Sequence, residues 1–366
     1  MYHKVLVVGG GIAGASTAIM LGRAGHGVTV VERDTQLRSS GSPVDVRGSA
    51  LAWVERMGVA EQLREADTGV RRVTFVDESG RTRARAALRR RASADFEVSR
   101  NALNEILMAA AAQVADITMA DGPVRLVSDA GGVNVTFESG TESRFDVVVG
   151  ADGQHSTVRR LAFGPESAYA RPLGLGIATV PVDDGLVAAP DVVEIFNVPG
   201  ACMSVHPAGG HPVAAFIWRT DDADQPRRRA EQQRVLERHF EDRGWLSSEL
   251  MEAVRDSTRD LYCDTVSRVA VPHWSLGRVV LLGDAATSIT ILGEGCSMAI
   301  TGAGRLAEVL GIGDHPALAF GRYESVHRSE VTRKQRGAGI GASVLVPRTS
   351  RGIAARNLLV SIARRV

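Results

Sequence analysis

The stretch KVLVVGGGIAG, residues 4–14, decides the fold of this chain. Its β-branched first half predicts a strand, and the small, helix-compatible residues 12–24 predict a helix directly after the glycines. A second apolar run, Val28–Val31, follows the turn residues Gly25-His26-Gly27 and completes a βαβ unit. Because such units pair their strands in parallel through a right-handed crossover, we expect an α/β fold built on a parallel sheet.

The turn between this strand and its helix carries the pattern G-x-G-x-x-G at Gly9, Gly11 and Gly14. Gly9 permits the tight turn, Gly11 lets the backbone approach a pyrophosphate, and Gly14 lets helix and strand pack closely. Glu32 lies 18 residues beyond Gly14, at the end of the second strand, where a carboxylate can accept hydrogen bonds from ribose hydroxyls. The pattern predicts a dinucleotide site; the alternative is a glycine-rich turn beside an exposed glutamate.

Composition and charge narrow the classes of function. The 366 residues include 43 Lys and Arg against 42 Asp and Glu, a net charge of +1, which disfavours nucleic acid as the main partner. No apolar stretch reaches the ~18 residues of a membrane span, and the four apolar residues before Gly9 are too few for a signal peptide. Three scattered cysteines indicate neither a disulfide framework nor a zinc site. We expect a cytoplasmic monomer or homodimer without a metal.

Two further strands run into acidic turns. Residues 146–153, DVVVGADG, and residues 277–286, GRVVLLGDAA, place Asp152 and Asp284 at the carboxyl ends of buried strands. Ligands of open α/β sheets bind at that edge. Between residues 165 and 270, short alternating segments separated by Pro, Gly and Asp are typical of an antiparallel sheet with one covered face.

Other elements follow from local patterns. The sequence predicts helices over 49–57, 100–114 and 297–310, a charged helical region over 226–258, a hairpin over 124–137 and a strand over 145–149. Residues 336–366 contain three spaced glycines and Pro347 before a basic amphipathic segment, which we expect to pack on the outside as a helical cover.

Three landmarks stand in order: GGGIAG with Glu32, GADGQHSTVRR at 150–160, and LLGDAA at 281–286 followed by GEGCSMAITGAGRLA at 293–307. In this order they resemble the FAD-dependent aromatic hydroxylases of the p-hydroxybenzoate hydroxylase fold, especially the tetracycline- and polyketide-modifying monooxygenases. The resemblance covers nearly the whole chain. It implies a Rossmann-like FAD-binding domain of the three-layer GR2 type, an inserted mixed or antiparallel substrate sheet, and a C-terminal helix.

The resemblance also implies a discontinuous division into domains. Residues 1–75, 98–165 and 272–335 are expected to form the FAD-binding domain, 76–97 and 166–271 the substrate-binding domain, and 336–366 the C-terminal helical segment.

Cofactor contacts carry over from the family residue by residue. The glycine pattern is expected to hold the FAD diphosphate, Glu32 the adenosine ribose, and Asp284 the ribityl or pyrophosphate region. Asp152 and Gly153 are expected to serve both FAD and transient NAD(P)H, and segment 293–297 to place a helix N-terminus under the flavin pyrimidine ring. The full expected set is Gly9, Gly11, Ile12, Ala13, Gly14, Glu32, Arg33, Arg47, Arg100, Asp152, Gly153, Gly283, Asp284, Gly293, Gly295, Cys296 and Ser297. For Arg100 the alternative is a solvated arginine at a helix start.

The implied activity is a monooxygenase of secondary metabolism, antibiotic biosynthesis or drug inactivation. It would use NAD(P)H and O2 to hydroxylate or epoxidise an aromatic or polyketide-like molecule through a flavin C4a-hydroperoxide. The cofactor supplies the chemistry, so no protein nucleophile is required. Segment 287–292, TSITIL, lacks the histidine and prolines of the family. This departure keeps open an FAD-dependent oxidoreductase or cyclase without oxygen insertion, and a non-catalytic carrier of the same fold is a further alternative.

Candidate substrate residues lie in the inserted sheet. His206 is a candidate to orient or deprotonate a phenol, with a partly buried structural histidine as the alternative. The candidate apolar walls, with plain core residues as the alternative, are Met203, Phe216, Trp218 and Tyr262.

Overall fold

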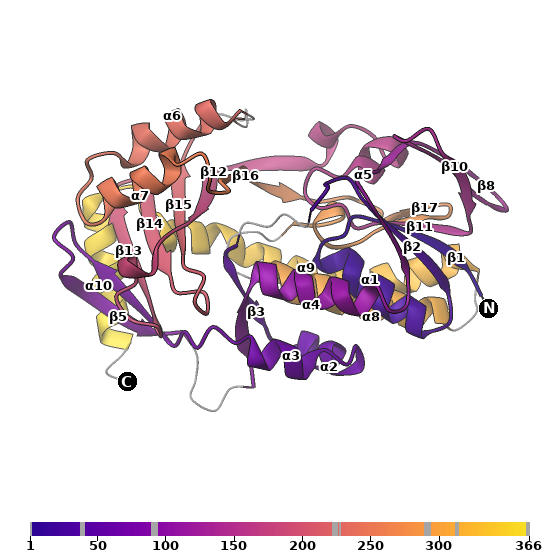
Figure 1. Ribbon diagram of the computed structural model, residues 1–366, viewed down its shortest axis with the longest axis horizontal. Helices are drawn as coiled ribbons and strands as arrows, with labels where there is room; N and C mark the ends of the chain where they lie inside the picture. Colours follow the sequence, from indigo (N-terminus) through magenta and orange to yellow (C-terminus); the bar gives the residue numbers. More distant parts are fainter. Residues whose placement is uncertain are drawn as a thin grey trace.

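The computed structural model describes residues 2–36, 41–88, 94–221, 226, 228–288, 294–311 and 315–363. Its elements gather around two large sheets, one in each half of an elongated molecule (Figure 1). Predicted residues outside these ranges include Gly293 and positions 289–292 of the departing segment.

The first half contains a six-stranded sheet of the order β17-β18-β11-β1-β2-β7. Its strands are β1 (Lys4–Val8), β2 (Gly27–Glu32), β7 (Asp116–Met119), β11 (Val147–Gly150), β17 (Ser275–Leu276) and β18 (Val279–Leu281). All neighbours pair in parallel except the β17 edge, so the predicted βαβ unit and parallel sheet are confirmed.

This sheet packs against two further layers, so the first half has three layers in all. Helices α1 (Ile12–Arg23), α4 (Arg100–Ala111) and α8 (Glu294–Gly311) pack together in one layer. The meander β8 (Pro123–Asp129), β9 (Gly132–Phe137) and β10 (Glu142–Phe145) shares the main hydrophobic core with the sheet. This arrangement confirms the Rossmann-like α/β fold class.

The second half contains a seven-stranded sheet of the order β16-β12-β15-β14-β13-β4-β5. Its strands are β4 (Arg72–Val76), β5 (Thr82–Ala87), β12 (Ala170–Pro181), β13 (Val192–Val198), β14 (Ala201–His206), β15 (Val213–Arg219) and β16 (Tyr262–Val269). Helices α6 (Arg229–Phe240) and α7 (Ser247–Arg255) cover one face of this sheet (Figure 1). Only β13 and β4 pair in parallel, so the predicted mixed sheet is confirmed.

The remaining elements include one small sheet and five helices. They are β3 (Pro43–Val46), which pairs with β6 (Phe96–Ser99), and the helices α2 (Ser49–Arg56), α3 (Ala60–Glu65), α5 (Thr157–Ala162), α9 (Pro316–Leu345) and α10 (Ser350–Ala363). Helix α9 runs from the first half toward the second, where α10 packs against β5 and β13 (Figure 1).

Several boundaries differ from the sequence predictions. Helix α4 ends at Ala111 rather than at 114, and α8 begins at Glu294 rather than at 297. The predicted strand 145–149 is divided between β10 and β11 at Asp146, whose carboxylate accepts a hydrogen bond from Lys4 N at 2.7 Å. Helix α9 continues through the three spaced glycines and ends at Leu345, so the expected break comes only before Pro347. The domain boundary expected after residue 335 therefore falls inside a helix.

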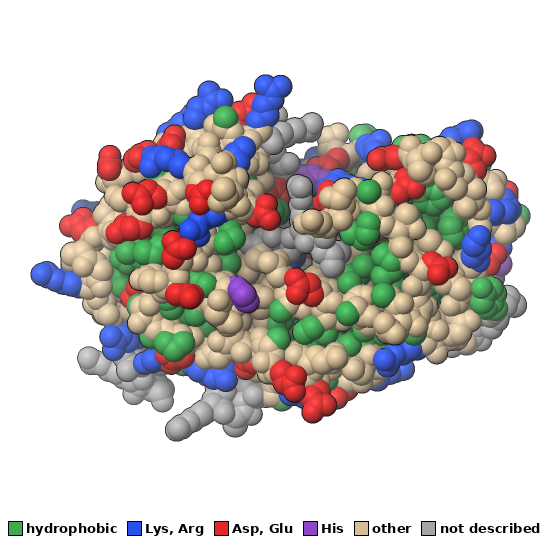
Figure 2. Space-filling model, viewed as in Figure 1, with side chains coloured by type: hydrophobic (Ala, Val, Ile, Leu, Met, Phe, Trp, Pro, Cys, Tyr) green, Lys and Arg blue, Asp and Glu red, His purple; other side chains and the backbone are tan. Residues whose placement is uncertain are grey.

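Charged side chains of both signs mingle over the face shown in Figure 2, as the near-zero net charge leads us to expect. Within the described ranges, no helix is long and apolar enough to cross a membrane. The same ranges contain no group of three His, Cys, Asp or Glu side chains arranged to hold a metal ion.

A buried histidine makes stability depend on pH. His327 of α9 stacks on Tyr323 and its Nδ1 lies 2.8 Å from Arg305 Nη1, so the neutral ring accepts a hydrogen bond from the guanidinium. Burial, followed by the charge of Arg305, lowers the pKa of His327 from 6.5 to about 4. Between these values the unfolded chain binds more protons than the folded chain, so acid favours unfolding.

We expect the free energy of unfolding, measured in urea, to fall by about 2 kcal/mol through this residue when the pH drops from 7.5 to 5. His327→Asn keeps an acceptor near Nδ1 but does not titrate, so its stability should depend less steeply on pH. The exposed His273→Asn is the control and should retain the wild-type slope. Equal slopes for wild type and His327→Asn would contradict this account.

Candidate functional site

Three strand ends meet at one edge of the six-stranded sheet. Val8 pairs with Gly150, and Gly150 pairs with Leu281, although these residues are far apart in the sequence. The glycine pattern, the Asp152 turn and the Asp284 turn therefore begin side by side. This is the edge at which open α/β sheets bind their ligands.

Folding requires glycine at two positions of the glycine pattern but not at the third. Gly9 has a φ of +104°, and a Cβ on Gly14 would lie 1.8 Å from Gly9 O, so both places require glycine for folding. A Cβ on Gly11 would meet no protein atom within 4 Å. Gly11 is the N-cap of α1, and neither a side-chain cap nor an acidic residue occupies this helix start. The first N–H groups of α1, which have no partner within the helix, and the open space at Gly11 fit a bound diphosphate.

Glu32 is held beside this helix start. Its carboxylate accepts hydrogen bonds from Gly10 N at 2.7 Å and from Asp34 N at 3.0 Å. Carboxylate oxygens have further lone pairs, so Glu32 can still accept from ribose hydroxyls next to a diphosphate at Gly11. Arg33 is exposed.

The neighbouring turn carries Asp284, which lies within the electrostatic influence of Arg100. Gly283, with a φ of +61°, turns the chain into Asp284, and a Cβ on Gly295 at the start of α8 would lie 3.9 Å from Asp284 Oδ1. Burial raises the pKa of Asp284, and the positive charge of Arg100 acts in the opposite direction. Arg100 Nη2 also lies 3.9 Å from Cys296 Sγ. The start of α4, the start of α8 and the Asp284 turn thus converge.

Ser297 ties α8 to the segment that carries Arg47. Its hydroxyl donates to Asp45 O at 2.8 Å and accepts from Arg47 N at 3.1 Å. The Arg47 guanidinium lies 3.6 Å from the Asp45 carboxylate. The Ser297 side chain is therefore used within the protein, which leaves only its backbone to face a cofactor.

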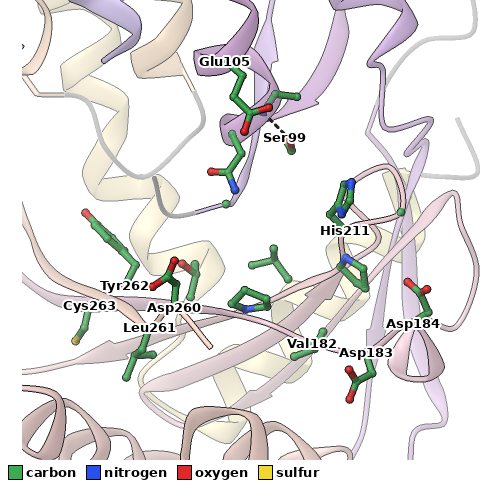
Figure 3. A pocket seen from close by; sticks show the side chains of 18 of the residues that line it. Ser99, Glu105, Val182, Asp183, Asp184, His211, Asp260, Leu261, Tyr262 and Cys263 are labelled. Atoms are coloured by element: carbon green, nitrogen blue, oxygen red, sulfur yellow. Dashed lines mark hydrogen bonds between the residues drawn. The ribbon is translucent and has the colours of Figure 1, made fainter. Parts of the chain in front are cut away.

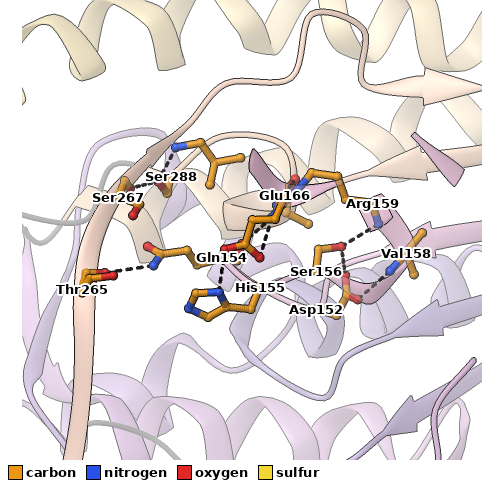
Figure 4. A network of polar contacts seen from close by, with 12 residues as sticks. Asp152, Gln154, His155, Ser156, Val158, Arg159, Glu166, Thr265, Ser267 and Ser288 are labelled. Carbon is orange, nitrogen blue, oxygen red and sulfur yellow. Dashed lines mark hydrogen bonds and ion pairs between the residues drawn. The ribbon is translucent and has the colours of Figure 1, made fainter. Parts of the chain in front are cut away.

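The Asp152 turn is stabilised by its own side chains (Figure 4). The Asp152 carboxylate accepts from Ser156 Oγ at 2.5 Å and from Val158 N at 3.0 Å. Arg159, which is fully buried, donates to Ala285 O at 3.0 Å and to Gln154 O at 2.6 Å. These bonds join the Asp152 turn to the Asp284 turn. The geometry gives the Asp152 side chain a role in shaping the loop, while Gly153, with a φ of +77°, has open space at its Cα.

A cavity of about 780 Å³ lies between the start of α4 and the seven-stranded sheet (Figure 3). One wall comes from the end of β6 and the start of α4, and the other from β12, the β14–β15 connection and the start of β16. The lining residues include Ser99, Asn101, Glu105, Thr179, Pro181, Val182, His211, Val213, Asp260, Leu261 and Tyr262.

The two faces of the seven-stranded sheet have different surroundings. Met203, Phe216 and Trp218 are buried in the core beneath α6 and α7, and the ring centroids of Phe216 and Phe240 lie 5.1 Å apart. Of the two alternatives for these three residues, cavity wall or plain core, the structure therefore favours the core, because alternation along the strands points them away from the cavity. Tyr262 does line it.

His206 lies on the cavity side of the sheet but not in the cavity wall. It pairs across the sheet with Val213, which lines the cavity, and its Nε2 lies 3.0 Å from Ser204 Oγ. Burial lowers the pKa of His206 to about 4, so the ring is neutral. The lining histidine is instead His211, in the β14–β15 connection. No sequence pattern marks this residue, because a single histidine between glycine and proline in a loop matches no motif.

A family model described as FAD binding domain matches residues 2–312. The chain belongs to the FAD-dependent aromatic hydroxylase family. An uncharacterized Mycobacterium tuberculosis protein is 36% identical over 346 residues, which cover 90% of this chain and 91% of the relative. A flavin-dependent monooxygenase of Legionella longbeachae is 30% identical over 359 residues, which cover 94% of this chain and 90% of the relative. The crystal structure of the tetracycline destructase Tet(51) superposes with a TM-score of 0.86 at 28% identity, covering 99% and 96% of the two chains. FAD is therefore the cofactor of this hydroxylase-family member.

Gly11→Val should weaken FAD binding by about tenfold or more, because the side chain enters space that the protein leaves open for the diphosphate. The flavin absorbance of purified protein and titration of the apoprotein with FAD measure this loss, while circular dichroism should stay unchanged.

Gly321→Val in α9 is the matched control, because a Cβ there also meets no protein atom within 4 Å. It should retain FAD. Full flavin content in Gly11→Val would refute the role of Gly11.

Proposed function

We propose that this chain is an FAD-dependent monooxygenase that uses NAD(P)H and O2 to hydroxylate or epoxidise an aromatic or polyketide-like small molecule. The observation that carries the proposal is the junction at the start of α4. Ser99 lines the cavity, and the next residue, Arg100, faces Asp284 and Cys296 on the expected cofactor side. A substrate in the cavity and a flavin at the sheet edge would therefore lie next to each other.

The protein's own residues bind and orient the reactants. The N-terminus of α1 at Gly11 holds the diphosphate, Glu32 the adenosine ribose, and Asp284 with the start of α8 the flavin half. When bound, FAD supplies hydride acceptance from NAD(P)H and electron transfer to O2. Arg100 places a positive charge at this junction, where it stabilises negative charge that develops on flavin or substrate.

The cavity favours a substrate with several rings. A volume of about 780 Å³ is within the range of small-molecule sites, and its walls combine Pro181, Val182 and Leu261 with the polar Tyr262 and His211. The name of the related tetracycline destructase supports a polycyclic, hydroxyl-bearing substrate class.

Purified holoprotein should oxidise NAD(P)H faster when a phenolic or polycyclic substrate is added, and product formed under ¹⁸O2 should contain one labelled oxygen atom. A screen by loss of NAD(P)H absorbance, followed by mass spectrometry, measures both. Substrate-dependent turnover without label would favour the oxidoreductase or cyclase instead. A protein that binds FAD but never oxidises NAD(P)H would favour the carrier.

Asp284→Asn should weaken FAD binding by about tenfold, a loss of about 1.4 kcal/mol, because it removes the charge that faces Arg100. Titration of apoprotein with FAD measures the change. Glu194→Gln, which alters a partly buried carboxylate on β13, is the matched control and should bind FAD as the wild type does. Equal affinities of the two variants would remove Asp284 from the cofactor site.

A further inference from the structure

Helix α10 turns its apolar side outward, in contrast to an ordinary surface helix, which buries that side. Leu358, Leu359 and Ile362 are 62%, 67% and 53% exposed. Together with the exposed Ala354 and Ala355 they recur every three or four residues, so they form one continuous face of the helix. We call these five residues the α10 face.

The opposite side of α10 buries a charge. Arg356 is 7% exposed, and its guanidinium carbon lies 4.0 Å from the centroid of the Phe75 ring. Its Nη2 donates to Asn197 Oδ1 at 2.9 Å, and its Nη1 donates to Val344 O at 3.3 Å. A buried guanidinium is costly unless it is paired, so a rotation that buried the leucines would lose these contacts. The outward direction of the α10 face is therefore fixed by packing.

The segment around α10 is strongly basic. Residues 331–366 contain eight Lys and Arg and no Asp or Glu, whereas the rest of the chain has 35 Lys and Arg against 42 Asp and Glu. Arg348 and Arg351 are exposed at the start of α10, and Arg364 and Arg365 follow its last residue in the sequence. The near-zero net charge of the whole chain thus conceals one basic segment that carries an exposed apolar face.

The acidic side chains beside the α10 face do not cancel this charge. Asp77 and Glu78 line a groove of about 640 Å³ that Leu358 also lines. Arg83 and Arg243 line the same groove, and Arg83 Nη2 lies 2.7 Å from Asp77 Oδ2. The two acids of the groove are therefore matched by two arginines, and the excess positive charge belongs to the helical segment.

We propose that the α10 face binds the surface of an anionic lipid bilayer. The helix lies in the plane of the interface, with Leu358, Leu359 and Ile362 among the upper parts of the acyl chains. The arginines that flank the face bind lipid phosphates, and their long side chains can reach the headgroups while the leucines are buried. This attachment is peripheral, and it does not depend on the reaction that the protein catalyses.

Charge favours a bilayer over a second copy of the chain. In a two-fold dimer the same patch meets itself, so Arg348 and Arg351 of both copies would gather at one interface and repel each other. An anionic bilayer instead supplies opposite charge together with an apolar interior. Helix α10 also lies beside β5 near one end of the elongated molecule, where a flat surface can reach it (Figure 1).

Co-sedimentation of the purified holoprotein with lipid vesicles tests the proposal. Vesicles of equal parts phosphatidylglycerol and phosphatidylcholine should bind it at least about tenfold more tightly than vesicles of phosphatidylcholine alone. Raising the salt from about 0.1 M to about 0.5 M should weaken this binding about tenfold, because salt screens the arginines. The double variant Leu358→Ser, Leu359→Ser should lose about tenfold or more, and Arg351→Gln about fivefold.

Leu318→Ser is the matched control, because Leu318 of α9 is also 62% exposed but lies outside the α10 face. It should bind the anionic vesicles as the wild type does. The FAD content and circular dichroism of all variants should stay unchanged, since each substitution replaces an outward-facing side chain.

Three results would overturn the proposal. They are a wild type that sediments with neither kind of vesicle, equal binding to both kinds, and a double variant that binds as tightly as the Leu318→Ser control. If the wild type ignores vesicles but forms a dimer that the double variant abolishes, the α10 face belongs to a second copy instead. The assay does not use NAD(P)H oxidation, so its failure is distinct from a failure of the proposed function.

Discussion

The close contact between α1 and β1 is the constraint on which the rest of the structure depends. A Cβ on Gly14 would lie 1.8 Å from Gly9 O, so only hydrogen allows the helix to rest on the strand end. This contact aims the α1 N-terminus over the sheet edge, where its unpaired N–H groups and partial positive charge attract a diphosphate. Glu32 and the other two turns lie beside that helix start, so their distances from a ligand bound there depend on this contact.

Arg159 makes a second set of contacts that hold the cofactor edge together. A fully buried guanidinium is costly unless its donors are paired, and here its two terminal nitrogens donate to carbonyl groups in the Asp152 and Asp284 turns. One side chain therefore joins two segments that lie more than a hundred residues apart in sequence. The same loop carries His155, whose Nε2 lies 3.4 Å from Asp264 Oδ1 of β16, so the cofactor edge is also fixed to the seven-stranded sheet.

Sequence reasoning predicted the βαβ unit and the three turns because glycine geometry and strand composition are local properties. It could not decide between Tyr262 and Phe216 as cavity residues, since period-two alternation predicts two faces without telling which one α6 and α7 cover. The sequence patterns also did not predict that α9 continues through residues 337–341. Glycines cost about 1 kcal/mol each in a helix interior, and the length of this 30-residue helix outweighs that penalty. The contact of His155 with Asp264 joins residues 109 positions apart, and no short-range pattern signals it.

Strand β12 is 12 residues long and pairs with β15 and with β16, which reaches back to Val269 in the core of the first half. The two halves are therefore joined by a ladder of hydrogen bonds rather than by a hinge. One evolutionary consequence concerns residues 207–211 of the β14–β15 connection, which form part of the cavity wall but lie outside this ladder. Mutations there can remodel the cavity while the distance between wall and cofactor edge stays constant. The shape of the cavity can thus change without any change in the three turns of the cofactor edge.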